Sequence, residues 1–109
     1  MKRHFSFRIR YIMNLHEIKG IVSKIAERYG VSKVLLFGSR AKGNEKPESD
    51  YDFLITSGNL KSLLQFSGFW LDLEEAFQAP VDIITDTSFE EDLISEAKRD
   101  GILIYERQR

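Results

Sequence analysis

One stretch, residues 34–56 (VLLFGSRAKGNEKPESDYDFLIT), constrains the fold of this chain more than any other. It begins with an apolar run at 34–37, which predicts a buried strand, and this run ends at Gly38 and Ser39, a pair typical of a turn. A polar segment then leads to a second predicted strand at 50–55 (DYDFLI). The stretch therefore predicts two strands joined through a strand-to-helix turn and a polar loop.

The second of these strands carries two carboxylates, Asp50 and Asp52. Because side chains alternate along a strand, both carboxylates lie on the same face, where they repel each other. A hard divalent cation with oxygen ligands, above all Mg²⁺, relieves such repulsion. A third acid, Asp82, lies in the predicted strand at 81–85 (VDIIT), where an acid is costly unless it reaches a metal. The three acids predict a metal site.

The turn at Gly38 and Ser39 predicts a phosphate site. Backbone N–H groups at a strand-to-helix turn can hold a phosphate, and the charges of Arg40 and Lys42 follow directly. Ser39 can also act as an ordinary helix cap, which is compatible with phosphate binding. The alternative for Arg40 and Lys42 is that they are solvated surface charges. A phosphate site beside a metal site indicates a nucleoside triphosphate.

These residues resemble the signature of a known family. Gly38-Ser39, then Asp50-x-Asp52, then Asp82 on a later strand is similar to the pattern of the DNA polymerase β-like nucleotidyltransferases. GSRAKG, SDYDFLI and VDII resemble the small, single-domain MNT-type members, many of which are antitoxin partners of HEPN-type toxins. The resemblance covers residues 14–106, nearly the whole chain.

The resemblance implies a specific chemistry. Asp50 and Asp52 would coordinate two Mg²⁺ ions, and Asp82 would hold the second ion and accept a hydroxyl proton. Gly38 and Ser39 would hold the phosphates of the leaving pyrophosphate. The implied reaction transfers AMP from ATP to a tyrosine of a HEPN-type toxin, which is the antitoxin activity of the family.

Composition excludes several other classes. A chain of 109 residues with no cysteine predicts one domain without disulfides or thiolate metal sites. A net charge of −1 argues against a general nucleic-acid binder. No apolar run approaches the ~20 residues that cross a bilayer, and the amino terminus lacks the core of a secretory signal. We therefore expect a cytoplasmic protein with no membrane contact and no direct nucleic-acid contact.

The chain divides into a basic extension at 1–13 and a nucleotidyltransferase domain at 14–109. The extension (MKRHFSFRIRYI before Met13) contains no acid; it can be a disordered tail, an added edge strand or a nucleic-acid contact. The domain begins where Asn14 and Glu17 form a predicted capping box.

The expected fold is α/β (α+β): a polymerase-β-like palm with a mixed sheet of about four strands and helices packed on it. Helices are expected at 15–29, at 59–77 capped by Asn59, and from a cap at Thr87 or Ser88 to about Arg99; a last strand is expected at 102–105. The residues expected to form the core stripe of the second helix are Leu60, Leu63, Leu64, Trp70, Leu71 and Phe77. Those expected to face inward from the third helix are Phe89, Leu93, Ile94 and Ala97, with Glu96 among its solvated acids.

Three functions compete at this stage. The first is a transferase acting on a partner toxin, which the broad apolar surface of the second helix favours. The second is an antitoxin that acts by contact alone, although three converging acids argue against it. The third is a stand-alone transferase for a small molecule or RNA that acts as a homodimer.

Overall fold

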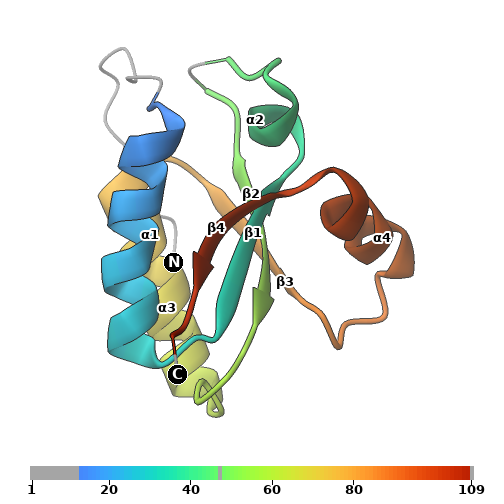
Figure 1. The fold of residues 1–109 in the computed structure, drawn as a ribbon. Coiled ribbons are helices and arrows are strands. Elements are labelled where there is room, and N and C mark those ends of the chain that lie inside the picture. Colours follow the sequence, from blue (N-terminus) through green and yellow to red (C-terminus); the bar gives the residue numbers. More distant parts are fainter. Residues whose placement is uncertain (1–12, 47, 109) are drawn as a thin grey trace.

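The structure, a computed structural model, describes residues 13–46 and 48–108 and forms the expected four-stranded α/β fold (Figure 1). The elements in chain order are α1 (Leu15–Tyr29), β1 (Lys33–Phe37), α2 (Ser39–Lys42), β2 (Tyr51–Thr56), α3 (Leu63–Phe77), β3 (Val81–Thr85), α4 (Glu91–Asp100) and β4 (Ile102–Glu106). Residues 1–12 of the predicted basic extension lie outside the described residues, so the domain boundary stays a prediction. Within the described ranges, no helix is both long enough and apolar enough to cross a membrane.

The sheet is mixed, with the strand order β3-β2-β1-β4. β1 pairs antiparallel with both β2 and β4, whereas β2 and β3 are parallel. A parallel pair needs a crossover connection, and α3 supplies it. The expected mixed sheet is therefore confirmed, and its one parallel pair joins the two strands that carry the acids.

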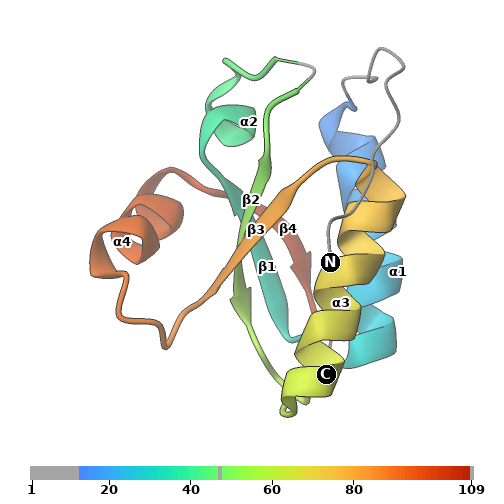
Figure 2. The same ribbon diagram turned by 180° about the vertical axis from the view of Figure 1, so that it is seen from behind.

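The helices cover the sheet unequally. α1 and α3 lie side by side on one face, and α4 lies alone on the other (Figures 1 and 2). The face under α1 and α3 holds the main core, which includes the fully buried aromatic residues Tyr51, Phe53 and Phe69. The face under α4 holds a small cluster built on Phe37, Leu54 and Ala97. The alternation of β2 sends Tyr51 and Phe53 to the first face and Asp52 and Leu54 to the second.

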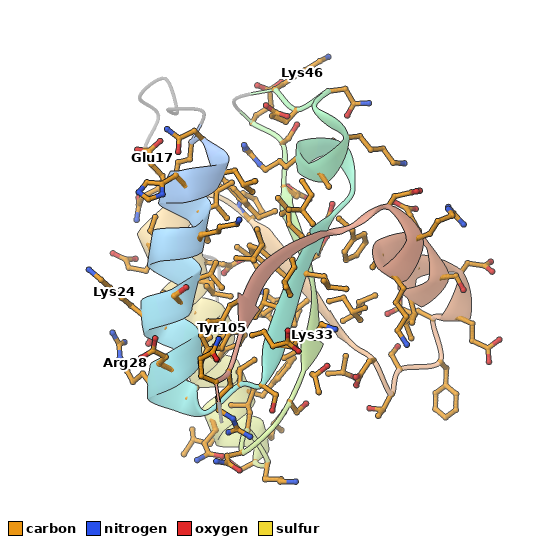
Figure 3. The ribbon with its side chains drawn as sticks, viewed as in Figure 1. Glu17, Lys24, Arg28, Lys33, Lys46 and Tyr105 are labelled. Atoms are coloured by element: carbon orange, nitrogen blue, oxygen red, sulfur yellow. The ribbon has the colours of Figure 1, made fainter. Side chains whose placement is uncertain are left out.

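The first helix agrees with its prediction. The Asn14 side chain accepts a hydrogen bond from the Glu17 backbone N–H (2.9 Å), and the Glu17 carboxylate accepts one from the Asn14 N–H (3.0 Å). Gly30 ends the helix in the left-handed conformation (φ 73°), which glycine adopts without strain. Glu17 lies at the first turn, and Lys24 and Arg28 point away from the sheet (Figure 3).

The predicted start of the second long helix is wrong. α3 begins at Leu63, and its capping box is formed by Ser62 and Gln65. Asn59 lies in the segment before the helix, where its backbone N–H donates to the Gly30 carbonyl at 2.8 Å and ties it to the end of α1. Ser62, directly before Leu63, supplies the cap instead.

The predicted core stripe of this helix is confirmed for half of its residues: Leu60 and Phe77 are buried, and Trp70 packs partly buried against the core. The other three, Leu63, Leu64 and Leu71, are exposed (81%, 84% and 44%). The buried side chains within α3 are Phe69, Leu73 and Phe77. The aromatic rings explain the choice: the Phe77 ring centroid lies 4.2 Å from that of Tyr51, and Phe69 makes an edge contact with Tyr29 at 5.8 Å. Large flat side chains bury more area than leucines at the same positions.

The third long helix also begins later than predicted. α4 begins at Glu91, because residues 86–89 are held in turns that extend β3. The Asp86 N–H donates to the Ile55 carbonyl and the Ser88 N–H to the Thr85 carbonyl, both at 3.1 Å. Phe89, predicted to face inward, is therefore fully exposed (100%), and Leu93 is partly exposed (37%).

Candidate functional site

The acids of the predicted metal site lie on the sheet face under α4. Asp52 of β2 and Asp82 of β3 are register partners on parallel neighbouring strands, so their side chains stand next to each other on that face. Asp50 directly precedes β2 and is exposed, and Asp82 is exposed too, whereas Asp52 is half-buried. The structure therefore brings Asp52 and Asp82 together and leaves Asp50 at the open end of the strand.

Asp52 has an altered acidity. Burial is the largest cause, followed by the charges of Asp82 and Asp50, a hydrogen bond with Asp82 and the charge of Glu96; together they raise its pKa to about 6. A raised pKa means that the ionised carboxylate is unfavourable at this position. A cation beside Asp52 would reverse that cost.

Gly38 makes room for Asp52. The backbone of Gly38 has φ 76° and ψ −154°, a region that is essentially restricted to glycine. A Cβ at this position would collide with the Asp52 carboxylate. β1 and β2 place the two residues in contact, since Phe37 is the register partner of Asp52. The turn that begins the predicted phosphate site is thus in direct contact with the predicted metal site.

The cationic side chains after this turn are both engaged by the protein. Arg40 is buried (8% exposed); its Nε and Nη2 donate to the Ser49 carbonyl at 3.2 and 2.7 Å, and its guanidinium lies 3.7 Å from the centre of the Tyr51 ring. Arg40 therefore holds the backbone that leads into Asp50. Ser39 begins α2, next to Gly38.

Lys42, at the end of α2, reaches across to α4. Its Nζ lies 3.5 Å from the Glu96 carboxylate, and both side chains are partly exposed. Glu96, predicted on the solvated face of α4, is only partly exposed and lines the cleft that holds Asp52. Its polar character gave no reason to place it at the site, but its spacing of one helical turn from Leu93 could have done so.

A cleft of about 580 Å³ surrounds the Asp52–Asp82 pair. It is large enough for a small ligand. Its lining residues are Phe37, Gly38, Asp52, Trp70, Asp82, Ile83, Ile84, Glu90, Leu93 and Glu96. Sequence reasoning did not assign Trp70, Glu90, Leu93 or Glu96 to the site. Trp70 is held by its indole N–H, which donates to the Val81 carbonyl at 2.6 Å at the edge of the sheet.

The donor set suits a hard cation. Asp52 and Asp82 offer only carboxylate oxygens, which Mg²⁺ prefers, and burial together with the neighbouring charges of Asp82 and Asp50 raises the pKa of Asp52. Within residues 13–46 and 48–108, no group of three or more acids, histidines or cysteines is close enough to form a complete protein metal site. A two-carboxylate site fits Mg²⁺, which usually completes its shell with water and substrate phosphates.

Comparison with known proteins identifies relatives that cover most of the chain. Residues 19–109 match the family described as "Polymerase beta, Nucleotidyltransferase". The protein MJ0435 of Methanocaldococcus jannaschii is 38% identical over 67% of this chain and 78% of its own length. Its name describes it, provisionally, as a protein adenylyltransferase. The protein adenylyltransferase MntA of Thermococcus cleftensis is 29% identical over 85% of this chain and 98% of its own.

The fold also recurs in a solved complex. The crystal structure is described as a tri-AMPylated HEPN toxin of Shewanella oneidensis in complex with an MNT antitoxin. Its similar chain superposes with a TM-score of 0.66, over 87% of this chain and 75% of that one, at 15% identity. At this identity the likeness concerns the fold alone.

Proposed function

This chain belongs to the polymerase beta nucleotidyltransferase family, and from that premise we propose that it transfers AMP from ATP to a tyrosine of a HEPN-type toxin and so acts as its antitoxin. Nucleotidyl transfer is the activity of the family. The donor, the acceptor and the need for Mg²⁺ are the proposed part.

One observation carries the proposal: the turn at Gly38 abuts the paired carboxylates of Asp52 and Asp82. A nucleotidyl transfer needs phosphate-binding groups and a cation site within one triphosphate of each other. Gly38 lies against the Asp52 carboxylate in a cleft of about 580 Å³, and this closeness supports a phosphate site and a cation site that serve the same ligand.

The relatives support the choice of acceptor. MntA is named a protein adenylyltransferase, and the Shewanella oneidensis complex pairs an MNT antitoxin with a HEPN toxin that carries AMP groups. The exposed apolar side chain of Leu93 lines the cleft, and the fully exposed Phe89 lines the adjoining hollow, as expected if the acceptor belongs to another protein.

The acids would act on both sides of the transfer. Asp52 and Asp82 would hold Mg²⁺, and Asp50, at the open end of the same strand, would add its charge. The bound ion would supply charge neutralisation for the triphosphate and lower the pKa of the attacking hydroxyl. The tyrosine oxygen forms a bond to the α-phosphorus, the bond from that phosphorus to the bridging oxygen breaks, and pyrophosphate leaves. Asp82, the more exposed member of the pair, accepts the hydroxyl proton.

The residues after β1 would hold the phosphates. The Gly38 backbone and the Ser39 hydroxyl contact the leaving pyrophosphate. Lys42 would leave its ion pair with Glu96 and pair with a phosphate instead. Because partly exposed ion pairs contribute little, we expect Lys42 to have a modest effect on nucleotide binding. Arg40 would act on the nucleotide site indirectly. Its two hydrogen bonds to the Ser49 carbonyl fix the backbone that leads into Asp50.

The test is transfer of label from α-labelled ATP, with Mg²⁺, to the protein encoded next to this chain. We expect that protein to be a HEPN-type toxin labelled on a tyrosine, and a loss of about 10²- to 10³-fold with Asp52→Asn or Asp82→Asn, because each variant removes a charged group from the transition state. Glu27→Gln, an exposed substitution on the opposite helix α1, is the matched control and should transfer at the parent rate.

Two outcomes would count against the proposal. Equal toxin neutralisation by Asp52→Asn and by the parent would mean that the chain acts by contact and not by catalysis. Label that appears on RNA or a small molecule, and never on protein, would keep the nucleotidyl transfer and replace the acceptor.

A further inference from the structure

The rim of the cleft carries an unusual apolar side chain. Phe89 is 100% exposed, and Leu93, one turn into α4, is 37% exposed. Leu93 and Glu90 line the cleft that contains Asp52 and Asp82, and both also line a second hollow, of about 410 Å³, whose wall includes Phe89. The apolar rim is therefore continuous with the cleft.

Hydrogen bonds on both sides of Phe89 hold its backbone. The Ser88 N–H donates to the Thr85 carbonyl at 3.1 Å, and the Glu91 N–H donates to the Phe89 carbonyl at 2.9 Å. The Ser88 hydroxyl accepts from the Glu90 N–H at 3.1 Å. Phe89 thus stands outward from a bonded turn, where its ring gains nothing from burial within this chain. An exposed ring of this size is the kind of group that interfaces bury.

The charged residues that line the hollow beside Phe89 are all acidic. They are Glu90, Glu91 and Asp92, which follow Phe89 directly in the chain. Acids at the start of a helix stabilise its dipole, so their presence alone would indicate no ligand. The dipole does not account for an apolar ring in water beside the cleft, however. The combination matches a partner segment that is apolar and positively charged.

The exposed leucines of α3 do not offer the same argument. Leu63 and Leu64 are 81% and 84% exposed, but neither lines the cleft. α3 also lies on the face of the sheet opposite α4 (Figures 1 and 2). From α3 only Trp70 is among the residues that line the cleft, so a group docked on Leu63 and Leu64 would not contact the cleft lining through those leucines.

We propose that residues 89–93, the cleft-rim surface, dock the segment of the acceptor protein that carries the accepting tyrosine, and that this segment has apolar and basic residues beside the tyrosine. The inference rests on the proposed function and deepens it, because it adds the chemistry by which the acceptor is selected. Phe89 and Leu93 bind the apolar residues, and Glu90, Glu91 and Asp92 bind the basic ones.

The test uses a library of short peptides with a central tyrosine and varied flanking residues, together with ATP and Mg²⁺. AMP addition to each peptide is read by mass spectrometry, and pyrophosphate release is measured in the same reactions. For the parent we expect flanking lysine, arginine and large apolar residues to be enriched among the modified peptides, and flanking acids to be depleted.

Three variants sharpen the test. Glu91→Lys combined with Asp92→Lys should reverse the charge preference toward acidic flanks, a gain that misfolding cannot imitate. Phe89→Ser should raise the KM for a preferred peptide about tenfold, since it removes the burial of an aromatic ring, and this effect should fall on the peptide and not on ATP. Leu64→Ala, an exposed apolar truncation on α3, is the matched control and should leave the peptide KM unchanged.

Each outcome bears on one of the two proposals. If the modified peptides show no preference for their flanking residues, the proposal for the cleft-rim surface is wrong and the proposed function still holds. The same follows if the charge-reversed variant keeps the parent's preference. Pyrophosphate release without modification of any peptide would also overturn it, because a docked segment should suffice as acceptor. If neither the library nor the neighbouring toxin receives AMP, and pyrophosphate is not released, the proposed function itself fails.

Discussion

The two faces of the sheet differ in role: one holds the main apolar core, and the other carries the carboxylates of the candidate site. The face under α1 and α3 is closed by two helices of 15 residues each and filled with stacked aromatic rings. The face under α4 has one helix of 10 residues, a three-residue cluster of buried side chains, and the carboxylates. Because side chains alternate along β2, a single strand supplies both faces. Stability and chemistry are thus separated by side-chain direction and not by distance along the chain.

The largest effect is expected on the closed face, from Phe77→Ala. Phe77 is 5% exposed and its ring stacks on Tyr51 at 4.2 Å, so its removal leaves a cavity. We expect the free energy of unfolding, measured by urea denaturation, to fall by about 3–5 kcal/mol. Leu71→Ala on the same helix, at a 44% exposed position, should cost less than about 1 kcal/mol. Equal losses would mean that α3 does not pack as described.

Gly38→Ala should damage both properties at once, because Gly38 is where the fold and the site meet. Its left-handed backbone disfavours any other residue, and the new methyl group would collide with the Asp52 carboxylate. We expect a loss of about 1–3 kcal/mol of stability together with reduced transfer. Gly20→Ala is the control, since the position of its Cβ is open and the helix favours alanine. A fully active Gly38→Ala variant would contradict the contact with Asp52.

Asp52→Asn should separate the two faces most clearly, by raising stability while lowering transfer about 10²- to 10³-fold. The pKa of Asp52 is raised from 3.8 to about 6, so its ionised form opposes folding above pH 6 and no longer does so near pH 4. After discounting for solvent screening, the variant should gain about 1 kcal/mol at pH 7.5 in a chelator, and the gain should vanish near pH 4.

The matching measurement is thermal unfolding of the parent and Asp52→Asn across this pH range, with and without Mg²⁺. Saturating Mg²⁺ should raise the Tm of the parent and leave that of the variant unchanged, because binding to the native state alone is stabilising. A variant that is less stable than the parent at pH 7.5 without metal would show that the carboxylate is not under electrostatic strain.

The smallest effect is expected from Lys42→Ala. The Lys42–Glu96 pair is partly exposed, at 3.5 Å, and pairs of this kind contribute about 0–1 kcal/mol. We expect less than a tenfold change in the KM for ATP and no measurable change in Tm. Lys24→Ala, on the outer surface of α1, is the control. If Lys42→Ala lost as much transfer activity as Asp52→Asn, Lys42 would belong to the essential groups.

The sequence allowed the strands and the first helix to be predicted. It failed where a local preference competed with the packing of the whole fold. Asn59 is a good helix cap in isolation, but α3 begins after Ser62, and Asn59 lies in the preceding segment with its backbone N–H bonded to the Gly30 carbonyl. Leu63 and Leu64 are good core residues, but Phe69 and Leu73 fill the space under α3. Phe89 looked like an inward residue of a helix that, in the fold, begins after it.

What the sequence determined by itself is local: the alternation of β2, the glycine turn after β1, and hence which side chains share a face. These depend on backbone sterics within a few residues. Only the tertiary structure decided that Asp82 stands beside Asp52, that Glu96 and Trp70 reach the same cleft, and that the pKa of Asp52 rises to about 6. The physical reason is that strand register and helix packing set distances between segments far apart in the chain, and both electrostatic coupling and burial depend on those distances.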